Sequence, residues 1–161
     1  MEIAIISDTH LPRDLGRLPD ACVERMRGAD LIIHAGDLMT MEVLAQLRLL
    51  GRVVAARGNV DDADVRSVLP EVAMVTAAGH RIAVLHDAGP TPGRLKRMRA
   101  RFPDAAAVVF GHSHIPLHEQ ARDGFQIFNP GSPTDRRRMP HHTMGACHAG
   151  EELAFEIIEL D

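Results

Sequence analysis

The stretch AIISDTH at residues 4–10 sets the pattern that decides the fold. It begins with a short apolar run, which is typical of a buried strand, and passes directly into Asp8 and His10. The same succession occurs four more times, as LIIHAGD at 31–37, VVAARGN at 53–59, IAVLHD at 82–87 and VVFGHSH at 108–114. We therefore predict five strands that each deliver Asp, Asn or His at the carboxyl end.

The segments around these strands predict the rest of the fold. Apolar residues at helical spacing predict helices over 15–27, 41–50 and 92–101. Strands at 3–7, 31–34 and 53–56 alternate with the first two helices, which predicts parallel strands. Later strands are expected at 72–77 and 81–85 around a turn at 78–80, at 106–110, at 117–121 and 126–129, and at 145–149 and 153–158. This order predicts an α/β fold with two facing sheets covered by helices.

Composition excludes several classes of protein. The 161 residues fit one domain, and a net charge of −4 gives no general reason to expect nucleic-acid or membrane binding. Cys22 and Cys147 lack the spacing of a metal pair, so we expect two reduced thiols. The first apolar run is too short for a signal-peptide core, and we expect a cytoplasmic protein.

The polar residues at the strand ends are expected to converge. In open α/β sheets the ligand crevice lies outside the carboxyl ends of the strands. Alternate residues of an extended segment project to the same side, so Asp8 with His10, and His112 with His114, can each reach one site. Glycines at 36, 58 and 111 are expected to let the backbone turn sharply before the following ligand.

The residue types in this set suit metal ions. Asp37 offers a carboxylate that can bridge two cations, and Asn59 offers a neutral oxygen. Imidazole nitrogen together with carboxylate oxygen favours Mn, Fe, Ni, Co or Zn over an all-oxygen calcium site. Each motif alone is commonly a turn or a surface loop, but five of them in order at strand ends favour a metal centre.

The ordered motifs resemble one known family. Asp8-x-His10, Gly36-Asp37, Gly58-Asn59-Val60-Asp61, His86, Gly111-His112-Ser113-His114 and Asn129-Pro130-Gly131-Ser132 resemble the calcineurin-like metallophosphoesterase superfamily, specifically its small bacterial and archaeal phosphodiesterase branch. The resemblance covers nearly the whole chain. It implies a single domain over 1–161, built as a four-layer α/β/β/α sandwich of two facing mixed sheets flanked by helices.

The resemblance also implies a binuclear centre. One metal ion would be held by Asp8, His10, Asp37 and His114, and the other by Asp37, Asn59, His86 and His112. Two divalent transition metal ions are expected, with manganese preferred and Ni, Fe, Co or Zn as alternatives. The implied reaction is hydrolysis of phosphodiesters, or of small phosphomonoesters, by a hydroxide that the two ions activate.

The general acid is the weak point of this mechanism. Many members of the superfamily carry His directly after the motif asparagine, and this chain has Val60 there. We therefore hypothesise that Asp61 or water supplies the proton, or that the leaving group needs none. The catalytic residues are expected to be Asp37, Asn59, His86 and Asp61.

Other residues carry open alternatives. Asp87 is either a turn residue or a hydrogen-bond acceptor behind a ligand histidine, and Arg57 either meets a substrate phosphate or is an exposed strand-end side chain. We expect His34 to support the site rather than to bind metal, and residues 136–138 to form a solvated basic loop. His80, His118, His141, His142 and His148 are interpreted as ordinary surface or hairpin residues.

Two alternative functions remain, a non-catalytic metal-binding scaffold of the same fold and a nuclease. The nuclease is disfavoured because the chain has no basic face and only 3% aromatic residues. The expected partner is a small phosphate ester, with no nucleic acid and no membrane. A homodimer or homotetramer is an open alternative to a monomer.

Overall fold

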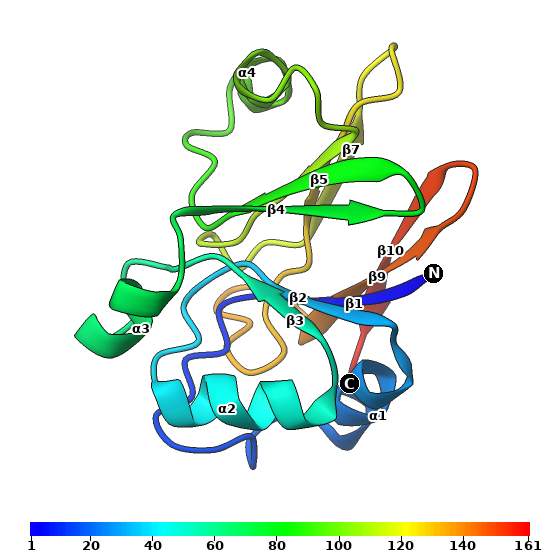
Figure 1. The fold of residues 1–161 in the computed structure, drawn as a ribbon. Helices are drawn as coiled ribbons and strands as arrows, with labels where there is room; N and C mark the ends of the chain where they lie inside the picture. The colour runs from blue at the N-terminus through cyan, green and yellow to red at the C-terminus, as the bar shows by residue number, and fades with distance from the viewer.

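The computed structural model describes residues 1–161 as two five-stranded sheets with four helices (Figure 1). The first sheet has the strand order β10-β9-β1-β2-β3 and the second the order β4-β5-β6-β8-β7. The strands are β1 (Glu2–Ile6), β2 (Leu31–His34), β3 (Val53–Ala55), β4 (Val72–Ala77), β5 (His80–Leu85), β6 (Ala107–Val109), β7 (Leu117–Gln120), β8 (Gln126–Asn129), β9 (Thr143–Ala149) and β10 (Leu153–Glu159). The helices are α1 (Asp20–Gly28), α2 (Met41–Leu50), α3 (Ala63–Val68) and α4 (Arg94–Arg101).

Both sheets are mixed. In the first sheet β1, β2 and β3 are parallel, as the βαβαβ pattern predicted, and β9 and β10 add antiparallel strands on the other side of β1. In the second sheet β5, β6 and β8 are parallel, and β4 and β7 are antiparallel edges. Parallel strands end at the same edge of a sheet, so this topology places the loops after them side by side.

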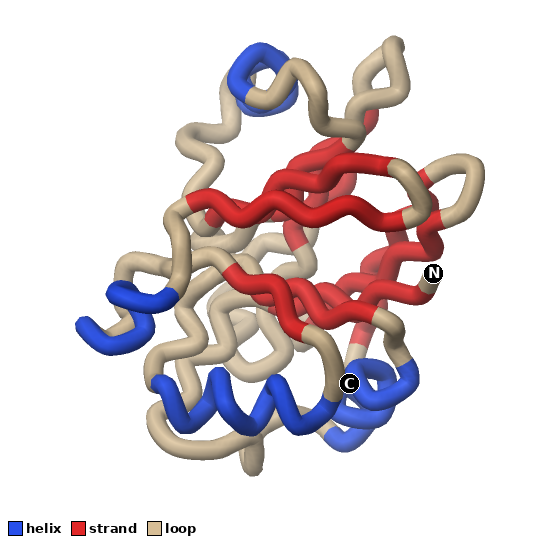
Figure 2. The backbone as a smooth tube through the Cα atoms, in the orientation of Figure 1, coloured by secondary structure: helices blue, strands red, loops and turns tan.

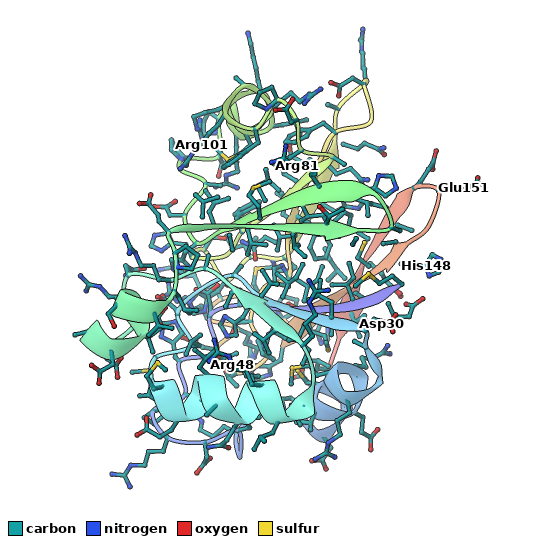
Figure 3. The ribbon with its side chains drawn as sticks, viewed as in Figure 1. Asp30, Arg48, Arg81, Arg101, His148 and Glu151 are labelled. Atoms are coloured by element: carbon teal, nitrogen blue, oxygen red, sulfur yellow. The ribbon has the colours of Figure 1, made fainter.

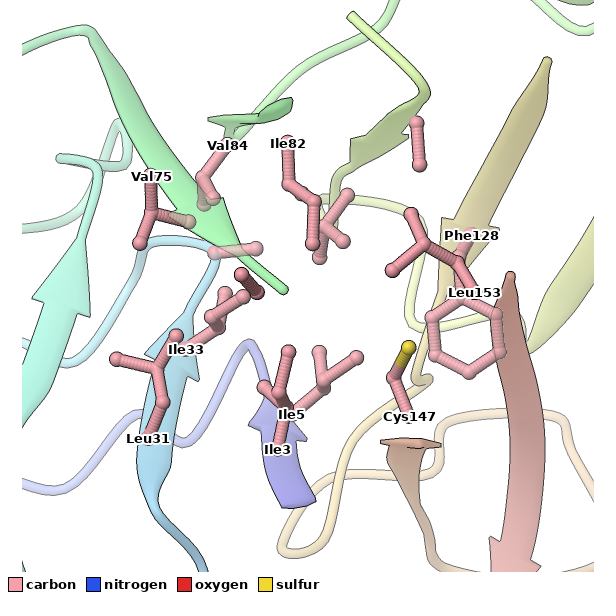
Figure 4. Packing of buried hydrophobic residues seen from close by; sticks show 14 of the residues in the cluster. Ile3, Ile5, Leu31, Ile33, Val75, Ile82, Val84, Phe128, Cys147 and Leu153 are labelled. Carbon is pink, nitrogen blue, oxygen red and sulfur yellow. The ribbon is translucent and has the colours of Figure 1, made fainter. Parts of the chain in front are cut away.

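Strand alternation divides the apolar residues between two sides of each sheet. In β1, Ile3 and Ile5 face the second sheet, and Ala4 and Ile6 face the helices. The cluster between the sheets contains 17 buried residues from both sheets, among them Phe128 of β8 (Figure 4). The two sheets therefore pack face to face through their apolar inner surfaces.

Helices cover the two outer faces. A second cluster of 16 buried residues joins the first sheet to α1 and α2 on one side of the molecule (Figure 2). A third cluster of 8 joins the second sheet to α4, through residues such as Met98 and Phe110. Helix, sheet, sheet and helix form four layers, which confirms the expected α/β/β/α sandwich. None of the helices is long and apolar enough to cross a membrane.

Charged side chains lie around the outside of these layers. Arg81 and Arg101 are exposed near α4, and His148 and Glu151 are exposed at the hairpin of β9 and β10 (Figure 3). Cys22 and Cys147 are free thiols, as expected, and they are buried on opposite sides of the first sheet.

The helices differ from the sequence prediction in three places. The helix expected over 92–101 begins at Arg94, because Gly93 is its left-handed N-cap. The helix expected over 15–27 begins only at Asp20, because a proline inside a helix removes a hydrogen bond and clashes with the preceding turn, and Pro19 stands there as the N-cap. The short helix α3 was not predicted. It begins at the N-cap Asp62, whose carboxylate accepts a hydrogen bond from the Val65 N–H at 2.9 Å.

Candidate metal centre

The structure brings together all seven side chains that the sequence singled out. Three strands of the first sheet deliver Asp8 and His10 after β1, Asp37 after β2 and Asn59 after β3. Two strands of the second sheet deliver the rest, which are His86 after β5 and His112 and His114 after β6. The candidate centre therefore lies where the ends of the two sheets meet.

One group of donor atoms forms around His114. Its Nε2 lies 3.3 Å from Nε2 of His10 and 3.5 Å from Oδ1 of Asp8. Nε2 of His10 lies 3.8 Å from Oδ2 of Asp37. Asp8, His10 and His114 can each offer an atom within 4.8 Å of the others, which is a spacing that one metal ion can span.

A second group forms around His86. Its Nε2 lies 3.0 Å from Oδ1 of Asn59 and 3.1 Å from Oδ2 of Asp37. Nδ1 of His112 faces the same point, 3.2 Å from Oδ1 of Asn59 and 3.4 Å from Nε2 of His86. Oδ2 of Asp37 thus faces both groups, and so does Oδ1 of Asp8, which lies 3.9 Å from Nε2 of His86.

The donor set fits transition metal ions. Four imidazoles, two carboxylates and an amide oxygen point their donor atoms inward, and they offer no thiolate and no all-oxygen cage. Ring nitrogens that face one another cannot all carry protons, so a shared cation suits the arrangement better than hydrogen bonds alone.

The local backbone differs from the extended segments that the sequence predicted. The φ angles are 55° at Asp8, 47° at His10, 70° at His112 and 60° at His114. Asp37 has φ 60°. These left-handed conformations are uncommon for residues other than glycine and are concentrated at functional sites. In each pair of candidate ligands, two residues with positive φ flank a third, so the segment is not extended.

The three glycines before the ligands act mainly through the space that they leave. A Cβ on Gly58 would lie 2.0 Å from Oδ1 of Asp37, and one on Gly111 would lie 1.9 Å from Oγ of Ser7. Gly36 has φ +94° and lies against the His86 ring. Only Gly36 therefore has the turning role that the sequence suggested for all three, and the other two allow close approach of the carboxylates.

Buried polar groups hold the metal-facing side chains. The Asp8 carboxylate accepts from Oγ of Ser7 at 2.7 Å and from the His112 N–H at 3.0 Å. Nδ1 of His86 lies 2.7 Å from the carbonyl of Ala35, and Nδ1 of His114 lies 2.5 Å from the carbonyl of Asp135. A carbonyl only accepts, so both rings carry a proton on Nδ1, and each ring in its neutral form turns the Nε2 lone pair inward.

Neighbouring charges set the ionisation of the centre. Burial raises the pKa of Asp8, and the facing His86 offsets part of this. Burial acts on Asp37 as well, but hydrogen bonds from His86 and the Val60 N–H outweigh it and lower the pKa of Asp37. Burial lowers the pKa of His10. Burial opposes the charged form of His86, yet its hydrogen bond to Asp37 and the charge of Asp8 raise its pKa.

His34 and Asp61 support the backbone from behind. His34 is fully buried, its Nδ1 accepts from the Gly36 N–H at 3.2 Å and its Nε2 lies 3.0 Å from Oγ1 of Thr9. Burial lowers the pKa of His34 to about 3, so the ring is neutral. The buried Asp61 carboxylate accepts three backbone N–H groups, from Asp37 at 3.3 Å, Met39 at 2.7 Å and Gly58 at 2.6 Å.

The loop after β8 fastens the metal-facing loops, a role that the sequence argument did not assign. Oγ of Ser132 donates to the carbonyl of Asp8 at 2.9 Å, and Oγ1 of Thr134 donates to the carbonyl of Thr9 at 2.6 Å. Asn129 donates to the carbonyl of Gly111 at 2.9 Å. The Asn-Pro-Gly-Ser motif gave the signal for this loop, but no local pattern pointed to Thr134 or Asp135.

Most of the remaining candidates lie away from the donor atoms, and only Arg57 and Asp87 lie near them. Residues 136–138 are exposed, as expected for a solvated loop, and His141 and His142 contact Asp161 near the surface. His148 pairs with Glu2, and His118 lies at hydrogen-bond distance from Gln126 within its own hairpin. His80 lies 3.0 Å from the carbonyl of Gly150, in the turn between β9 and β10 of the other sheet. Arg57 and Asp87 line a cavity of about 230 Å³ beside Asn59, His86 and His112.

Comparisons with known proteins place this fold and centre in a family. The family model of the calcineurin-like phosphoesterase superfamily domain matches residues 1–152. A probable metallophosphoesterase from Methanocaldococcus jannaschii is 36% identical to this chain, and the match covers 100% of this chain and 82% of that relative. The chain therefore belongs to the calcineurin-like phosphoesterase superfamily. Within it, the chain is similar to relatives described as metallophosphoesterases.

Solved structures show the same fold. Vacuolar protein sorting 29 from Cryptosporidium parvum has a TM-score of 0.83 at 20% identity, over 99% of this chain and 91% of that one. A structure described as a novel archaeal phosphodiesterase has a TM-score of 0.76 at 20% identity, over 99% of this chain and 100% of that one. These neighbours share the architecture, whether their titles name a sorting protein or an enzyme.

Proposed function

We propose that this protein is a binuclear metal-dependent phosphodiesterase that also accepts small phosphomonoesters. The observation that carries the proposal is the position of Asp37. Its Oδ2 lies 3.1 Å from Nε2 of His86 and 3.8 Å from Nε2 of His10, so one carboxylate oxygen faces two groups of nitrogen and oxygen donors. Membership of the superfamily supports the same conclusion.

The seven side chains would hold two divalent ions, with manganese as our first candidate. Two such ions supply a water of lowered pKa and polarise the phosphoryl oxygens of a bound ester. The protein fixes the donor atoms in advance: Ala35 and Asp135 orient two imidazoles, and Ser7 orients the Asp8 carboxylate. A site held this rigidly loses little free energy to reorganisation when the substrate arrives.

The chain supplies no evident proton donor for the leaving group. Val60 stands directly after Asn59 and is 41% exposed, so an apolar side chain occupies the place where a histidine would help. Asp61 faces three backbone N–H groups, and we propose that it positions the turn at Gly58 while water supplies the proton. Esters with good leaving groups, such as aryl esters, are therefore expected to react faster than alkyl esters.

Reconstitution of the metal-stripped protein tests the proposal. Mn, Ni, Mg or Zn is added separately, bound metal is counted by elemental analysis, and hydrolysis of bis(p-nitrophenyl) phosphate is followed. We expect two ions per chain and turnover with at least one transition metal. Asp37→Asn should lower both the number of bound ions and the turnover. Asp104 is an exposed carboxylate near Arg81, and Asp104→Asn should change neither quantity.

Each contrary result points to a different conclusion. Two bound ions without turnover of any phosphate ester would favour the scaffold. Full activity in Asp37→Asn or His112→Asn would refute the assignment of the site. Equal rates for aryl and alkyl diesters, with chemistry limiting, would show that a proton donor exists after all.

A further inference from the structure

A polar cavity adjoins one half of the candidate metal centre. It measures about 230 Å³, and Leu85 is its only apolar lining residue. Asn59, His86 and His112 form one wall, and Arg57, Glu71 and Asp87 form much of the rest. A phosphate bound at the centre would therefore extend one of its ester substituents into this space.

The charges that line the cavity do not cancel. The Arg57 guanidinium lies 3.9 Å from Oε2 of Glu71 and 3.4 Å from the carbonyl of Arg66, so its charge is already offset. Asp87 has no such cation beside it. The only ionisable partner at its Oδ2 is Nε2 of His112 at 4.0 Å, and the opposite nitrogen of that ring faces Asn59 and His86. Asp87 is thus the one carboxylate of the lining without an arginine or lysine partner.

The structure holds Asp87 in this position. Its Oδ1 accepts the Gly89 N–H at 2.7 Å and closes a tight turn, which leaves Oδ2 toward His112. Two arginines of α4 fasten the same loop. Arg97 donates to the carbonyls of Ala88 and Pro90, both at 2.8 Å, and Arg94 donates twice to the carbonyl of Gly89. The carboxylate is therefore a fixed feature of the cavity wall.

We propose that this cavity is the subsite for a hydrophilic ester substituent without negative charge, and that Asp87 makes the enzyme prefer phosphodiesters over phosphomonoesters. The inference rests on the proposed phosphoesterase function and names its substrate class. The lining can bind a hydroxylated or cationic group because it presents polar side chains, among them the Asp87 carboxylate. A volume of this size suits a pentose or a choline-sized group rather than a long acyl chain.

The preference has a simple electrostatic cause. A phosphomonoester carries close to two negative charges at neutral pH, because its second pKa is about 6, whereas a diester carries one. A carboxylate on the cavity wall repels the additional charge and attracts a cationic substituent. For a half-exposed group this is worth about three- to tenfold in relative kcat/KM.

Three substrates that all release p-nitrophenolate test this with the leaving group held constant. They are p-nitrophenyl phosphate, p-nitrophenyl phosphorylcholine and thymidine 5′-(p-nitrophenyl phosphate), whose retained groups are anionic, cationic and neutral. We expect the wild type to prefer both diesters. Asp87→Asn keeps the acceptor for Gly89 and should lower the choline-to-monoester ratio of kcat/KM about three- to tenfold, mainly through KM. Glu71→Gln should move the ratio in the same direction because it frees Arg57.

Asp14→Asn is the matched control, since Asp14 also accepts the N–H of a glycine two residues later, at 2.8 Å, but does not line the cavity. Calorimetric titration of the metal-loaded proteins gives a second readout. The affinity for phosphocholine, divided by the affinity for inorganic phosphate, should be lower in Asp87→Asn than in the wild type. An unchanged ratio in Asp87→Asn, with normal turnover, would overturn the subsite and leave the phosphoesterase standing. No turnover of any ester by the wild type, with any metal, would overturn both.

Discussion

At the scale of single residues, the candidate centre is built on an unfavourable backbone. Five of its seven side chains belong to residues with positive φ, each of which costs on the order of 1–3 kcal/mol. Hydrogen bonds to neighbouring loops hold them there, including Asp8 N–H to the carbonyl of Gly36 and His10 N–H to the carbonyl of Asp37, both at 3.0 Å. The folded chain therefore keeps its metal-facing atoms in place before any ion binds.

Gly111→Ala tests the close approach of the loops. The new Cβ would lie 1.9 Å from Oγ of Ser7 and 2.7 Å from Oδ2 of Asp8, so buried groups must move. We expect a loss of about 1–3 kcal/mol in the free energy of unfolding, and weaker metal binding. Urea titration and metal analysis measure the two effects. Gly28→Ala, where nothing lies within 4 Å, is the control and should not destabilise the protein. Equal stabilities of the two variants would contradict the packing argument.

His34 predicts a loss of stability in acid. Burial depresses its pKa from 6.5 to about 3, so the unfolded chain binds the proton more readily than the folded one. The unfolding free energy therefore suffers no penalty from His34 above pH 6.5, where the ring is neutral in both states. It falls as the pH drops from 6.5 toward 3, because the unfolded chain takes up the proton first. Between pH 6 and 4, the unfolding free energy of the metal-free wild type should fall about 1.4 kcal/mol per pH unit more steeply than that of His34→Gln. Parallel curves in urea titrations would show that His34 is not the responsible group.

At the scale of elements, the sequence predicts the strands better than the helices. The apolar runs are short and end at polar residues, so β2, β4 and β8 have the expected bounds, and the remaining strand ends agree within two residues. The start of the helix expected over 15–27 was wrong because Pro19 ends any helical turn before it, although the apolar spacing from Leu15 onward is helical. Helix α3 has six residues and one buried side chain, Val65, so it has no periodicity to detect.

The candidate site was predictable in its membership but not in its geometry. Residue type and position after a strand are visible in the sequence, and they pointed to all seven side chains. The positive φ angles depend on hydrogen bonds between loops far apart in the chain, such as that of Ser132 to Asp8. The support that Asp135 gives to His114 has the same long-range origin. No local pattern contains this information.

Helix α3 provides a test at this scale. The Asp62 carboxylate caps its first turn, and the N–H of Asp62 donates to the carbonyl of Met39 at 2.9 Å. Asp62→Ala should cost about 1 kcal/mol of unfolding free energy, because the Val65 N–H loses its acceptor. Asp62→Asn retains an acceptor oxygen and should cost much less. Chemical denaturation of both variants gives the comparison, and identical losses would mean that the cap contributes nothing.

At the scale of the whole molecule, the candidate metal centre spans the junction of the two sheets. Asp8, Asp37 and Asn59 follow strands of the first sheet, and His86 and His112 follow strands of the second. Ions bound between them would link the two halves of the core. Metal loading should therefore stabilise the whole domain and not only the loops.

Thermal unfolding with and without metal measures this link. At a free Mn²⁺ concentration one hundred times its Kd, the native state gains about 2.7 kcal/mol per site. Each occupied site therefore raises Tm by roughly 5–10 °C for a domain of this size, and two sites by about twice as much. A chelator should reverse the rise, and Asp37→Asn should show little of it. A Tm that does not respond to transition metals would argue against a centre that joins the sheets.

The position of β1 has a consequence for biosynthesis. This strand lies between β2 and β9, and the N-terminal amine of Met1 donates to the carbonyl of Ala149 at 2.9 Å. The ribosome makes β1 well before β9, and synthesis of the stretch between them takes roughly 10–30 s at usual elongation rates. During that time one edge of an apolar central strand has no partner, and such edges are prone to mispairing. The first sheet can be completed only after β9 has been made, so the nascent chain is exposed to mispairing of β1 until then.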